Sequence, residues 1–466
     1  MFGLGFGLSV LLVLCILCVC AFEFINGFHD TANAVATVIY TKSLKPWRAV
    51  VLSGVLNGLG VFLGGTAVAM GIINMLPVET LVDQDVTHSL GMVGAILLTA
   101  IIWNLGTWFL AIPASSSHTL IGAILGVGIA YSLLPGTGDA AVNWHKASEV
   151  GLSLLFSPLF GFILAICLMS FLARAFAHKL ELFRAPEGDL PPPWWIRGTL
   201  IATCGLVSFS HGSNDGQKGI GLMMLVLIGI IPAKFSLDAR YGDREISQSL
   251  AQVQKDFDIV SNELKDARSQ TIIQDASIPL AELNVLTHQL TDTRKGNHRF
   301  KIRKNILLFR NSVAKLHGEQ GGELPASVAA LARSATSLRQ FTDYAPLWVI
   351  VLIALSLGIG TMIGWERIVV TIGEKIGKTH LTYAQGTSAE IVAASTIAAS
   401  TYLGLPVSTT HVLSSGIAGA MFSSGGLSNL DKSTIQKILL AWVLTFPVCV
   451  TLSGTLFLIF RSVLGS

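Results

Sequence analysis

Long apolar runs with few charges dominate the sequence. A helix needs about 20 mostly apolar residues to cross the hydrocarbon core of a bilayer, so runs of this length are candidates for membrane-spanning helices. The clearest runs cover residues 4–22, 49–75, 89–112, 150–172, 347–365, 388–405 and 438–460. This pattern predicts an all-α polytopic membrane protein.

The first apolar run continues past Phe22 to Tyr40. A secretory signal peptide has a positively charged start and a small-residue cleavage site. The run has neither feature. We therefore expect a first membrane helix here rather than a signal peptide.

Polar segments divide the chain into two membrane halves. Residues 1–176 form the first half, and a polar linker at 177–193 ends in three consecutive prolines, which break regular structure. Apolar character returns at 194–235 and at 344–466, which together form the second half. Between them, residues 236–343 are rich in charge and amphipathic without a strand period. We expect a small helical soluble domain inserted into the second half.

The composition agrees with a membrane protein. Hydrophobic residues make up 52% of the chain and charged residues 13%, whereas about 25% of a typical soluble domain is charged. The net charge of +3 is not gathered into a basic stripe, which argues against nucleic-acid binding. The six cysteines lie in apolar segments without a metal-ligand or disulfide pattern, and we interpret them as packing residues.

Two pairs of motifs recur in the same order in the two halves. Residues 26–33 (NGFHDTAN) match 211–218 (HGSNDGQK), and residues 113–118 (PASSSH) match 406–411 (PVSTTH). The chain therefore contains an internal repeat. Duplication alone also occurs in channels and structural membrane proteins, so the polar residues inside the repeats decide the interpretation.

The charges of the short loops give an orientation, because basic short loops face the cytoplasm. Lys42, Lys45 and Arg48 share one loop, whereas the loop at 76–88 is acidic. Counting crossings from these loops places both termini and the insert outside the cytoplasm and the linker inside. The halves then have inverted topology, which is common in secondary transporters and places the substrate site at the midplane between the repeats.

Each half carries a stripe of polar residues spaced three or four apart, which places each stripe on one helix face. In the first half these residues are Glu23, Asn26, Asp30, Asn33 and Thr37. At matching positions the second half has Ser208, His211, Asp215 and Lys218. Ionisable groups at membrane depth usually line a cavity or face a partner. Asp30 and Asp215 are the strongest candidates for binding the coupling cation, Na⁺ or H⁺; alternatively, Asp215 and Lys218 simply neutralise each other.

Three glycines interrupt these stripes, at positions 27, 212 and 216. They are candidates for breaks in the helices. Breaks would free backbone carbonyls as cation ligands, as in other transporters with discontinuous helices.

The motifs at 113–118 and 406–411 suit an anion. A half-helix that starts at the proline directs unpaired backbone N–H groups and its positive dipole end at a ligand. The hydroxyl groups add hydrogen-bond donors, which an oxyanion needs when it loses its hydration shell. The alternative is that these serines and threonines only pack between membrane helices. Two copies in register favour a binding site.

Histidines accompany both motif pairs, at positions 29, 118, 211 and 411. His118 and His411 are candidates for binding substrate or relaying protons, and a packing role is the alternative. A hydrolase is not indicated, because there is no nucleophile-elbow motif. There is also no P-loop, so an ion gradient is the expected energy source. We expect no catalytic residues, no resident cofactor and no structural metal.

These residues resemble the paired signature of the inorganic phosphate transporter (PiT) family. The stretches NGFHDTANAVATVIYT, FSHGSNDGQKGIGLMMLVLIG and PVSTTHVLSS are similar to those of the bacterial low-affinity Pit transporters. The resemblance implies two inverted repeats with broken helices or re-entrant hairpins and about 10–12 membrane segments. It implies uptake of inorganic phosphate across the inner membrane, with proton coupling and carriage as a neutral complex with a divalent metal. The insert has no useful resemblance.

Carried over by position, the resemblance assigns two groups of site residues. The coupling-cation group is Asp30, Asn33, Asn214 and Asp215. The phosphate group is Ser115, Ser116, Ser117, Ser408, Thr409 and Thr410. Glu23, His29, Lys218, His118 and His411 are expected to support the site or relay protons.

The chain departs from the sodium-coupled pattern at two positions. His29 replaces an asparagine, and Lys218 stands where Asn33 stands in the other repeat. Our hypothesis is that the fixed ammonium group of Lys218 substitutes for a bound cation and leaves protons to drive transport. The alternatives are a Na⁺-coupled phosphate symporter, a transporter or channel for another oxyanion or a divalent metal, and a membrane-bound phosphate sensor. The expected partners are phosphate, the coupling cation and lipids, with a homo-oligomer as an open possibility and nucleic acid excluded.

Overall fold

The computed structural model describes residues 3–75, 86–134, 142–186, 188, 190–288, 298–319 and 325–464, and these residues are almost entirely helical. The acidic loop on which the orientation depends (Glu79, Asp83 and Asp85) lies outside the described residues. The chain forms two compact units. The first combines Met1–Val226 with Ala345–Ser466, and the second is Leu227–Tyr344. The boundary falls within one long helix, α8 (Trp194–Ile230).

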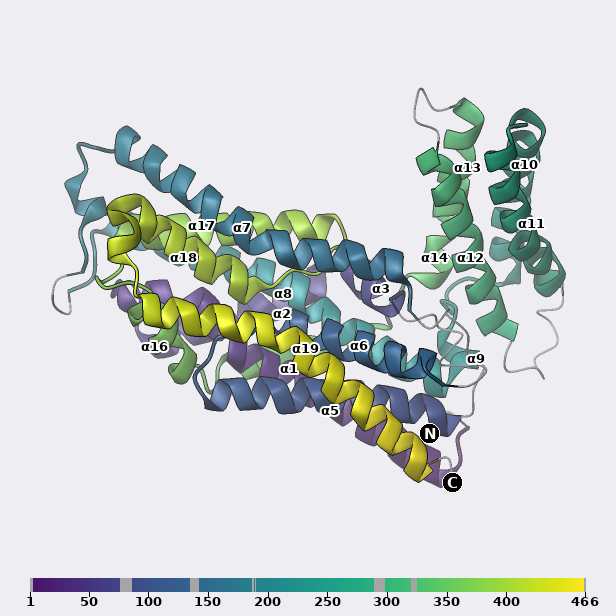
Figure 1. Cartoon of the computed structure of the whole chain (residues 1–466), viewed down its shortest axis with the longest axis horizontal. Helices are drawn as coiled ribbons and strands as arrows, with labels where there is room; N and C mark the ends of the chain where they lie inside the picture. The colour runs from purple at the N-terminus through teal and green to yellow at the C-terminus, as the bar shows by residue number, and fades with distance from the viewer. Residues whose placement is uncertain are drawn as a thin grey trace. The chain divides into compact units, whose positions relative to one another are not determined.

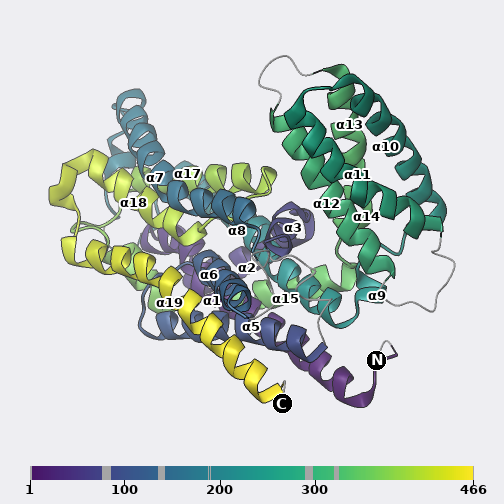
Figure 2. The ribbon, with the colours of Figure 1, turned by 45° about the vertical axis from the view of Figure 1, so that its right-hand side comes forward.

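The helices of the first unit are drawn in Figures 1 and 2. Before α8 they are α1 (Phe6–Tyr40), α2 (Pro46–Leu63), α3 (Ala67–Ile73), α5 (Val86–Phe109), α6 (Ser116–Ser132) and α7 (Trp144–Ala175). After the second unit they are α15 (Leu347–Thr361), α16 (Glu366–Glu374), α17 (Tyr383–Tyr402), α18 (Thr409–Gly425) and α19 (Lys432–Leu464). Short 3₁₀ turns follow α7 and α18.

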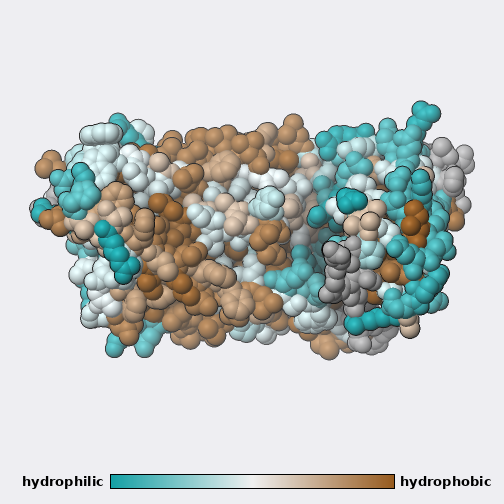
Figure 3. All heavy atoms as spheres, turned by 90° about the horizontal axis from the view of Figure 1, so that it is seen from above, coloured by the Kyte–Doolittle hydropathy of each residue, from teal (hydrophilic) through white to brown (hydrophobic). Residues whose placement is uncertain are grey.

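Within the described residues, five helices are long and apolar enough to span a membrane, and six if one bent pair counts as a single span. These five spans are Phe6–Tyr40, Pro46–Leu63, His88–Phe109, Trp144–Ala175 and Lys432–Val463. Apolar side chains point outward from them, and Figure 3 shows hydrophobic residues over much of the visible face of the first unit. A total of ten to twelve membrane segments stays a prediction.

The polar-stripe helices are continuous, so the expectation that glycine breaks them is wrong. Helix α1 passes through Gly27 and α8 passes through Gly212 and Gly216 without interruption. The glycines instead permit close helix packing. A Cβ atom on Gly27 would lie 2.5 Å from the carbonyl oxygen of Leu357 in α15. Gly212 lies against the backbone of Asn57 in α2 in the same way.

The helices that carry the hydroxyl motifs are short. α6 and α18 have 17 residues each, about 26 Å at 1.5 Å per residue, which is less than the hydrocarbon core of about 30 Å. They begin at Ser116 and Thr409, with Ser115 and Ser408 as N-caps. The prolines at 113 and 406 therefore precede the helices and do not lie in their first turns, contrary to the sequence-based expectation.

The second unit is a helical bundle with its own core. It contains α9 (Pro232–Phe235), α10 (Asp243–Glu263), α11 (Ala267–His288), α12 (His298–Glu319), α13 (Ala326–Ser337) and α14 (Arg339–Thr342). Apolar residues of α10 recur at helical spacing and pack on the neighbouring helices. Buried Arg303 donates to the carbonyl oxygens of Ser236, at 3.1 Å, and Thr342, at 2.6 Å. It thereby joins the segments where the chain enters and leaves the bundle, and burial lowers the pKa of its guanidinium.

Candidate functional site

The polar stripes lie in the buried parts of α1 and α8. The start of α1 presents mostly exposed apolar side chains, whereas nearly every residue from Phe22 to Val38 is buried. In α8 every residue from Ser210 to Val226 is buried. Burying so many polar groups is costly unless they find partners, so these two segments mark a specific polar site inside an apolar shell.

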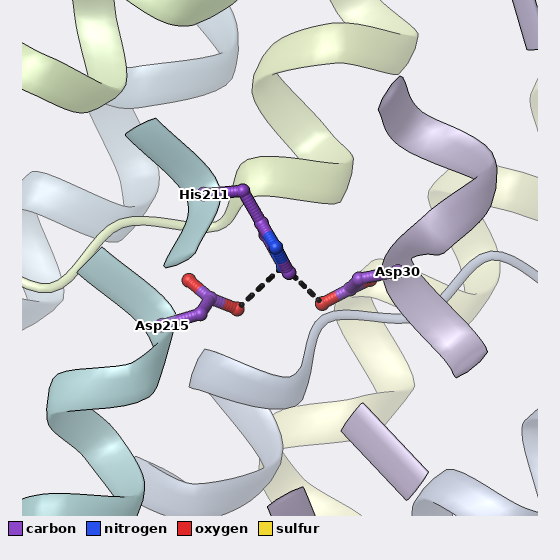
Figure 4. A group of neighbouring side chains, drawn as sticks. All are labelled: Asp30, His211 and Asp215. Carbon is purple, nitrogen blue, oxygen red and sulfur yellow. Dashed lines mark ion pairs between the residues drawn. The ribbon is translucent and has the colours of Figure 1, made fainter. Parts of the chain in front are cut away.

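Three side chains from the two stripes meet at the centre of this site, as Figure 4 shows. His211 Nε2 lies 3.6 Å from Asp30 Oδ2 and 3.3 Å from Asp215 Oδ2. The imidazole thus bridges the carboxylates that the sequence singled out on α1 and α8. One candidate ligand atom from each residue lies within 4.8 Å of the others, close enough to hold one cation. A mixed carboxylate and imidazole set suits a divalent metal such as Mn²⁺ or Zn²⁺.

Asn33 and Lys218 occupy equivalent places beside these carboxylates. Asn33 Nδ2 donates to Asp30 Oδ1 at 3.2 Å and to Thr410 Oγ1 at 3.0 Å. Lys218 Nζ donates to Asp215 Oδ2 at 2.6 Å and to Ser117 Oγ at 2.8 Å. Asn33 therefore joins Asp30 to Thr410 in the first turn of α18. Lys218 joins Asp215 to Ser117, at the matching position in α6. The amide group of Asn33 in one repeat is thus replaced by the ammonium group of Lys218 in the other.

The hydroxyl groups play different roles. Ser115 and Ser408 accept from the backbone N–H of the residue three positions later, so they cap α6 and α18. Ser116 Oγ donates to Asp30 Oδ2 at 3.3 Å, and Thr410 Oγ1 donates to Asp30 Oδ1 at 2.5 Å. Buried Thr409 lies beside them in the first turn of α18. The first turns of both helices thus converge on the carboxylates.

The residues before the two signature aspartates have different partners, since His29 Nδ1 still lies 3.5 Å from Asp30 Oδ1. Asn214 Nδ2 donates to Thr401 Oγ1 at 2.9 Å and to the carbonyl of Leu405, and its Oδ1 accepts from Val407 N. His29 Nε2 lies 3.2 Å from Thr107 Oγ1 in α5. The structure therefore does not bring Asn214 to the carboxylate cluster. It holds the connection between α17 and α18 and so positions the start of α18.

The two motif histidines meet behind the hydroxyl groups. The ring centroids of His118 and His411 lie 4.6 Å apart, and His411 stacks on Trp442 at 3.8 Å. His118 Nδ1 lies 2.9 Å from Ser115 Oγ, and Trp442 Nε1 donates to the carbonyl of Pro113. These contacts join the starts of α6 and α18. They fit a positioning role at least as well as a role in binding substrate.

Sequence reasoning missed Glu390, a fully buried carboxylate on α17. It accepts hydrogen bonds from Thr37 in α1 and Thr203 in α8. The signal was present, because this glutamate lies inside one of the apolar runs, and an ionisable residue at membrane depth indicates function by default.

Comparisons with known proteins agree with a transport protein of this architecture. Residues 26–453 match the family model described as "Phosphate transporter family". The chain is 41% identical to "Low-affinity inorganic phosphate transporter PitB" of Escherichia coli (strain K12), over 98% of this chain and 97% of that protein. It is 28% identical to "Probable low-affinity inorganic phosphate transporter" of Bacillus subtilis (strain 168), over 98% and 99% of the two chains.

A solved structure titled "The sodium-dependent phosphate transporter" shares the fold, with a TM-score of 0.55 and 18% identity. It covers 97% of this chain and 100% of its own. The all-helical arrangement and the buried polar site define a membrane transport protein. The chain belongs to the phosphate transporter family, as its sequence motifs predicted. Its relatives are transporters, so the chain is a transporter and not an enzyme.

Proposed function

We propose that this chain is a symporter that imports inorganic phosphate across the bacterial inner membrane together with protons. The observation that carries the proposal is the position of Lys218. Its ammonium group lies between Asp215 and the hydroxyls of Ser116 and Ser117, at the first turn of α6. This point combines a positive charge, hydroxyl donors and a helix N-terminus, which are the groups that bind an oxyanion.

Phosphate would bind between the first turns of α6 and α18. The N–H groups at N1 and N2 of a helix have no intrahelical acceptor and are available to an anion. Ser116, Ser117, Thr409 and Thr410 lie at these positions. Ser115 and Ser408 would support the site as caps. Ser116 and Thr410 now donate to Asp30, so both hydroxyls would turn from the carboxylate to phosphate on binding.

The same lysine favours protons over Na⁺. A sodium ion beside Asp215 would have to lie close to the Lys218 ammonium, which is 2.6 Å from the carboxylate. Like charges repel strongly where the dielectric is low. Asp30 is joined by the uncharged side chains of Asn33 and Thr410 and has no lysine paired with it among the described residues, so this half of the site would still accept a cation. A Na⁺-coupled symporter is the alternative that a gradient experiment separates.

A divalent metal would travel as part of the substrate. Asp30, His211 and Asp215 form a buried group with ligand atoms of suitable chemistry and spacing. The cluster adjoins the hydroxyls proposed for phosphate, since Ser116 contacts both carboxylates. A metal-phosphate complex would therefore place its cation at the carboxylates and its oxyanion at the helix N-termini. Because the complex has no net charge, the free-energy cost of carrying it across the membrane would be lower.

The helix contacts support an inverted repeat. α1 packs on α15 and α8 on α2, while α6 packs on α19 and α18 on α7. The contact of α1 with α15 thus corresponds to that of α8 with α2 when the two halves are exchanged. The contact of α6 with α19 corresponds in the same way to that of α18 with α7. We propose inverted repeats with both termini periplasmic, the linker cytoplasmic and the helical insert soluble outside the cytoplasm. A homo-oligomer is compatible with this arrangement.

The substrate is tested by exchange of radiolabelled phosphate in proteoliposomes that contain the purified protein. Unlabelled phosphate inside should drive entry of label, excess external sulfate should not compete, and Mg²⁺ or Mn²⁺ should raise the rate. Equal competition by sulfate, or metal uptake that does not need phosphate, would overturn the assignment of the substrate.

A further inference from the structure

Glu23 is a fully buried carboxyl group on α1 that the proposed binding sites do not use. Its Oε2 accepts one long hydrogen bond, 3.5 Å from Asn26 Nδ2. Its Oε1 has no hydrogen-bond partner among the described residues. An ionised carboxylate in such a place is very costly, whereas a protonated one is tolerable. This conformation therefore favours Glu23 with a proton bound.

Glu23 packs directly against the part of α8 that carries the lysine. A Cβ atom on Gly219 would lie 2.6 Å from both Cδ and Oε1 of Glu23, and Lys218 immediately precedes this glycine. The charged groups that act on Glu23 all come from α8 and are Lys218, Asp215 and His211. On its own helix the neighbouring titratable group is Cys20.

In this structure the Lys218 ammonium group binds Asp215 and not Glu23. Its Nζ lies 2.6 Å from Asp215, 3.0 Å from Ser116 and 2.8 Å from Ser117. It thereby holds its charge at the proposed phosphate site. The lysine stem is flexible and its ammonium group is a compact charge. Glu23 contacts Gly219, the next residue of α8. It is therefore a second carboxylate to which the ammonium group can move.

We propose that Glu23 is the proton-carrying residue of the symporter and that it controls phosphate affinity through Lys218. This proposal rests on the proposed function. With its proton bound, Glu23 is neutral, and Lys218 stays at the hydroxyl groups, where its charge attracts phosphate. When the proton passes from Glu23 to water on the cytoplasmic side, the carboxylate attracts the ammonium group. Phosphate then loses its positive partner and leaves.

The coupling is reciprocal, as linkage requires. Proton binding at Glu23 raises the affinity for phosphate, and phosphate binding raises the affinity of Glu23 for its proton. The other repeat has no equivalent group. Ser208 occupies the matching position, and its hydroxyl donates to Ser53 Oγ and to the carbonyl of Cys204. The first repeat thus supplies the proton carrier, Glu23, and the second supplies the movable charge, Lys218.

The test compares Glu23→Gln, which mimics the protonated state, with Glu149→Gln as a control. Glu149 is partly exposed and pairs with Lys146 near the start of α7. Wild type and control should bind radiolabelled phosphate more weakly at alkaline than at acidic pH, by a factor of about ten or more. This factor corresponds to the loss of one charge-assisted hydrogen bond. Glu23→Gln should lose most of this difference. Since phosphate itself changes charge, each variant is compared with wild type at the same pH.

In proteoliposomes, Glu23→Gln should exchange phosphate but no longer accumulate it under an inward proton gradient. Accumulation like that of wild type, or an unchanged pH dependence of binding, would overturn the role of Glu23. Loss of exchange in both Glu23→Gln and Glu23→Asn would also overturn it, because a coupling residue is not needed for exchange. Absence of phosphate exchange in wild type would instead refute the proposed function.

Discussion

Replacing Lys218 with methionine removes the positive charge from the proposed phosphate site and keeps most of the side-chain volume. The variant loses three hydrogen bonds, to Asp215, Ser116 and Ser117. It also leaves Asp215 as a buried carboxylate whose remaining ionic neighbour among the described residues is His211, at 3.3 Å. Both phosphate affinity and stability should therefore fall.

The two effects have different sizes. A hydrogen bond to a charged group contributes about 1.5–3 kcal/mol, so loss of the ammonium should weaken phosphate binding by about 10- to 150-fold. Breaking a buried ion pair by removing one partner costs about 3–5 kcal/mol of stability.

Equilibrium binding of radiolabelled phosphate to purified protein measures the first effect. Lys146→Met is the matched control, because Lys146 also pairs with a carboxylate three residues away, Glu149, at 2.8 Å, but is partly exposed. The control should bind like wild type. If Lys218→Met binds phosphate as tightly as the control, the ammonium group does not contact the anion and the proposed site is wrong.

The same position also tests the choice of coupling ion. Lys218→Asn gives the second repeat the residue that Asn33 provides in the first. Uptake by this variant should gain a dependence on Na⁺, because an amide oxygen replaces the repelling ammonium group beside Asp215. Transport with unchanged ion dependence would show that Lys218 does not substitute for a cation.

Three further changes test other parts of the account. Ser117→Ala should weaken phosphate binding by about 2- to 12-fold, the value of one neutral hydrogen bond, whereas Ser132→Ala, at the far end of the same helix, should not. Gly27→Ala places a Cβ 2.5 Å from a backbone oxygen of α15 and should cost about 1–3 kcal/mol; an unchanged thermal unfolding midpoint would contradict the close packing. Arg303→Met leaves two buried carbonyls without their donor, at about 1–3 kcal/mol each. It should speed amide exchange at both ends of the second unit, and exposed Arg244→Met should not.

Helical spacing was sufficient to predict which residues of each stripe lie together in the buried polar cluster. Residues three or four apart share a helix face, and this put Asp30 with Asn33 and Asp215 with Lys218, as the hydrogen bonds show. The motif repeat also matched residues in equivalent surroundings. Thr410 binds Asn33, and Ser117, at the matching motif position, binds Lys218.

Spacing does not show which helices face each other. The sequence could not indicate that the α1 stripe meets α18 of the other half, or that α8 meets α6. It also placed Asn214 with the cation ligands, whereas its amide holds the chain before α18. Glycine was a poor guide to helix breaks, because at Gly27 and Gly212 the missing side chain admits a neighbouring backbone. Such long-range contacts depend on tertiary packing.

The most direct test is accumulation of radiolabelled phosphate in proteoliposomes under an imposed inward proton gradient, compared with an imposed inward Na⁺ gradient. The account predicts uphill accumulation with protons alone and none with Na⁺ alone. Accumulation that requires Na⁺ and ignores the proton gradient would contradict it, and would remove the roles proposed for Lys218 and Glu23.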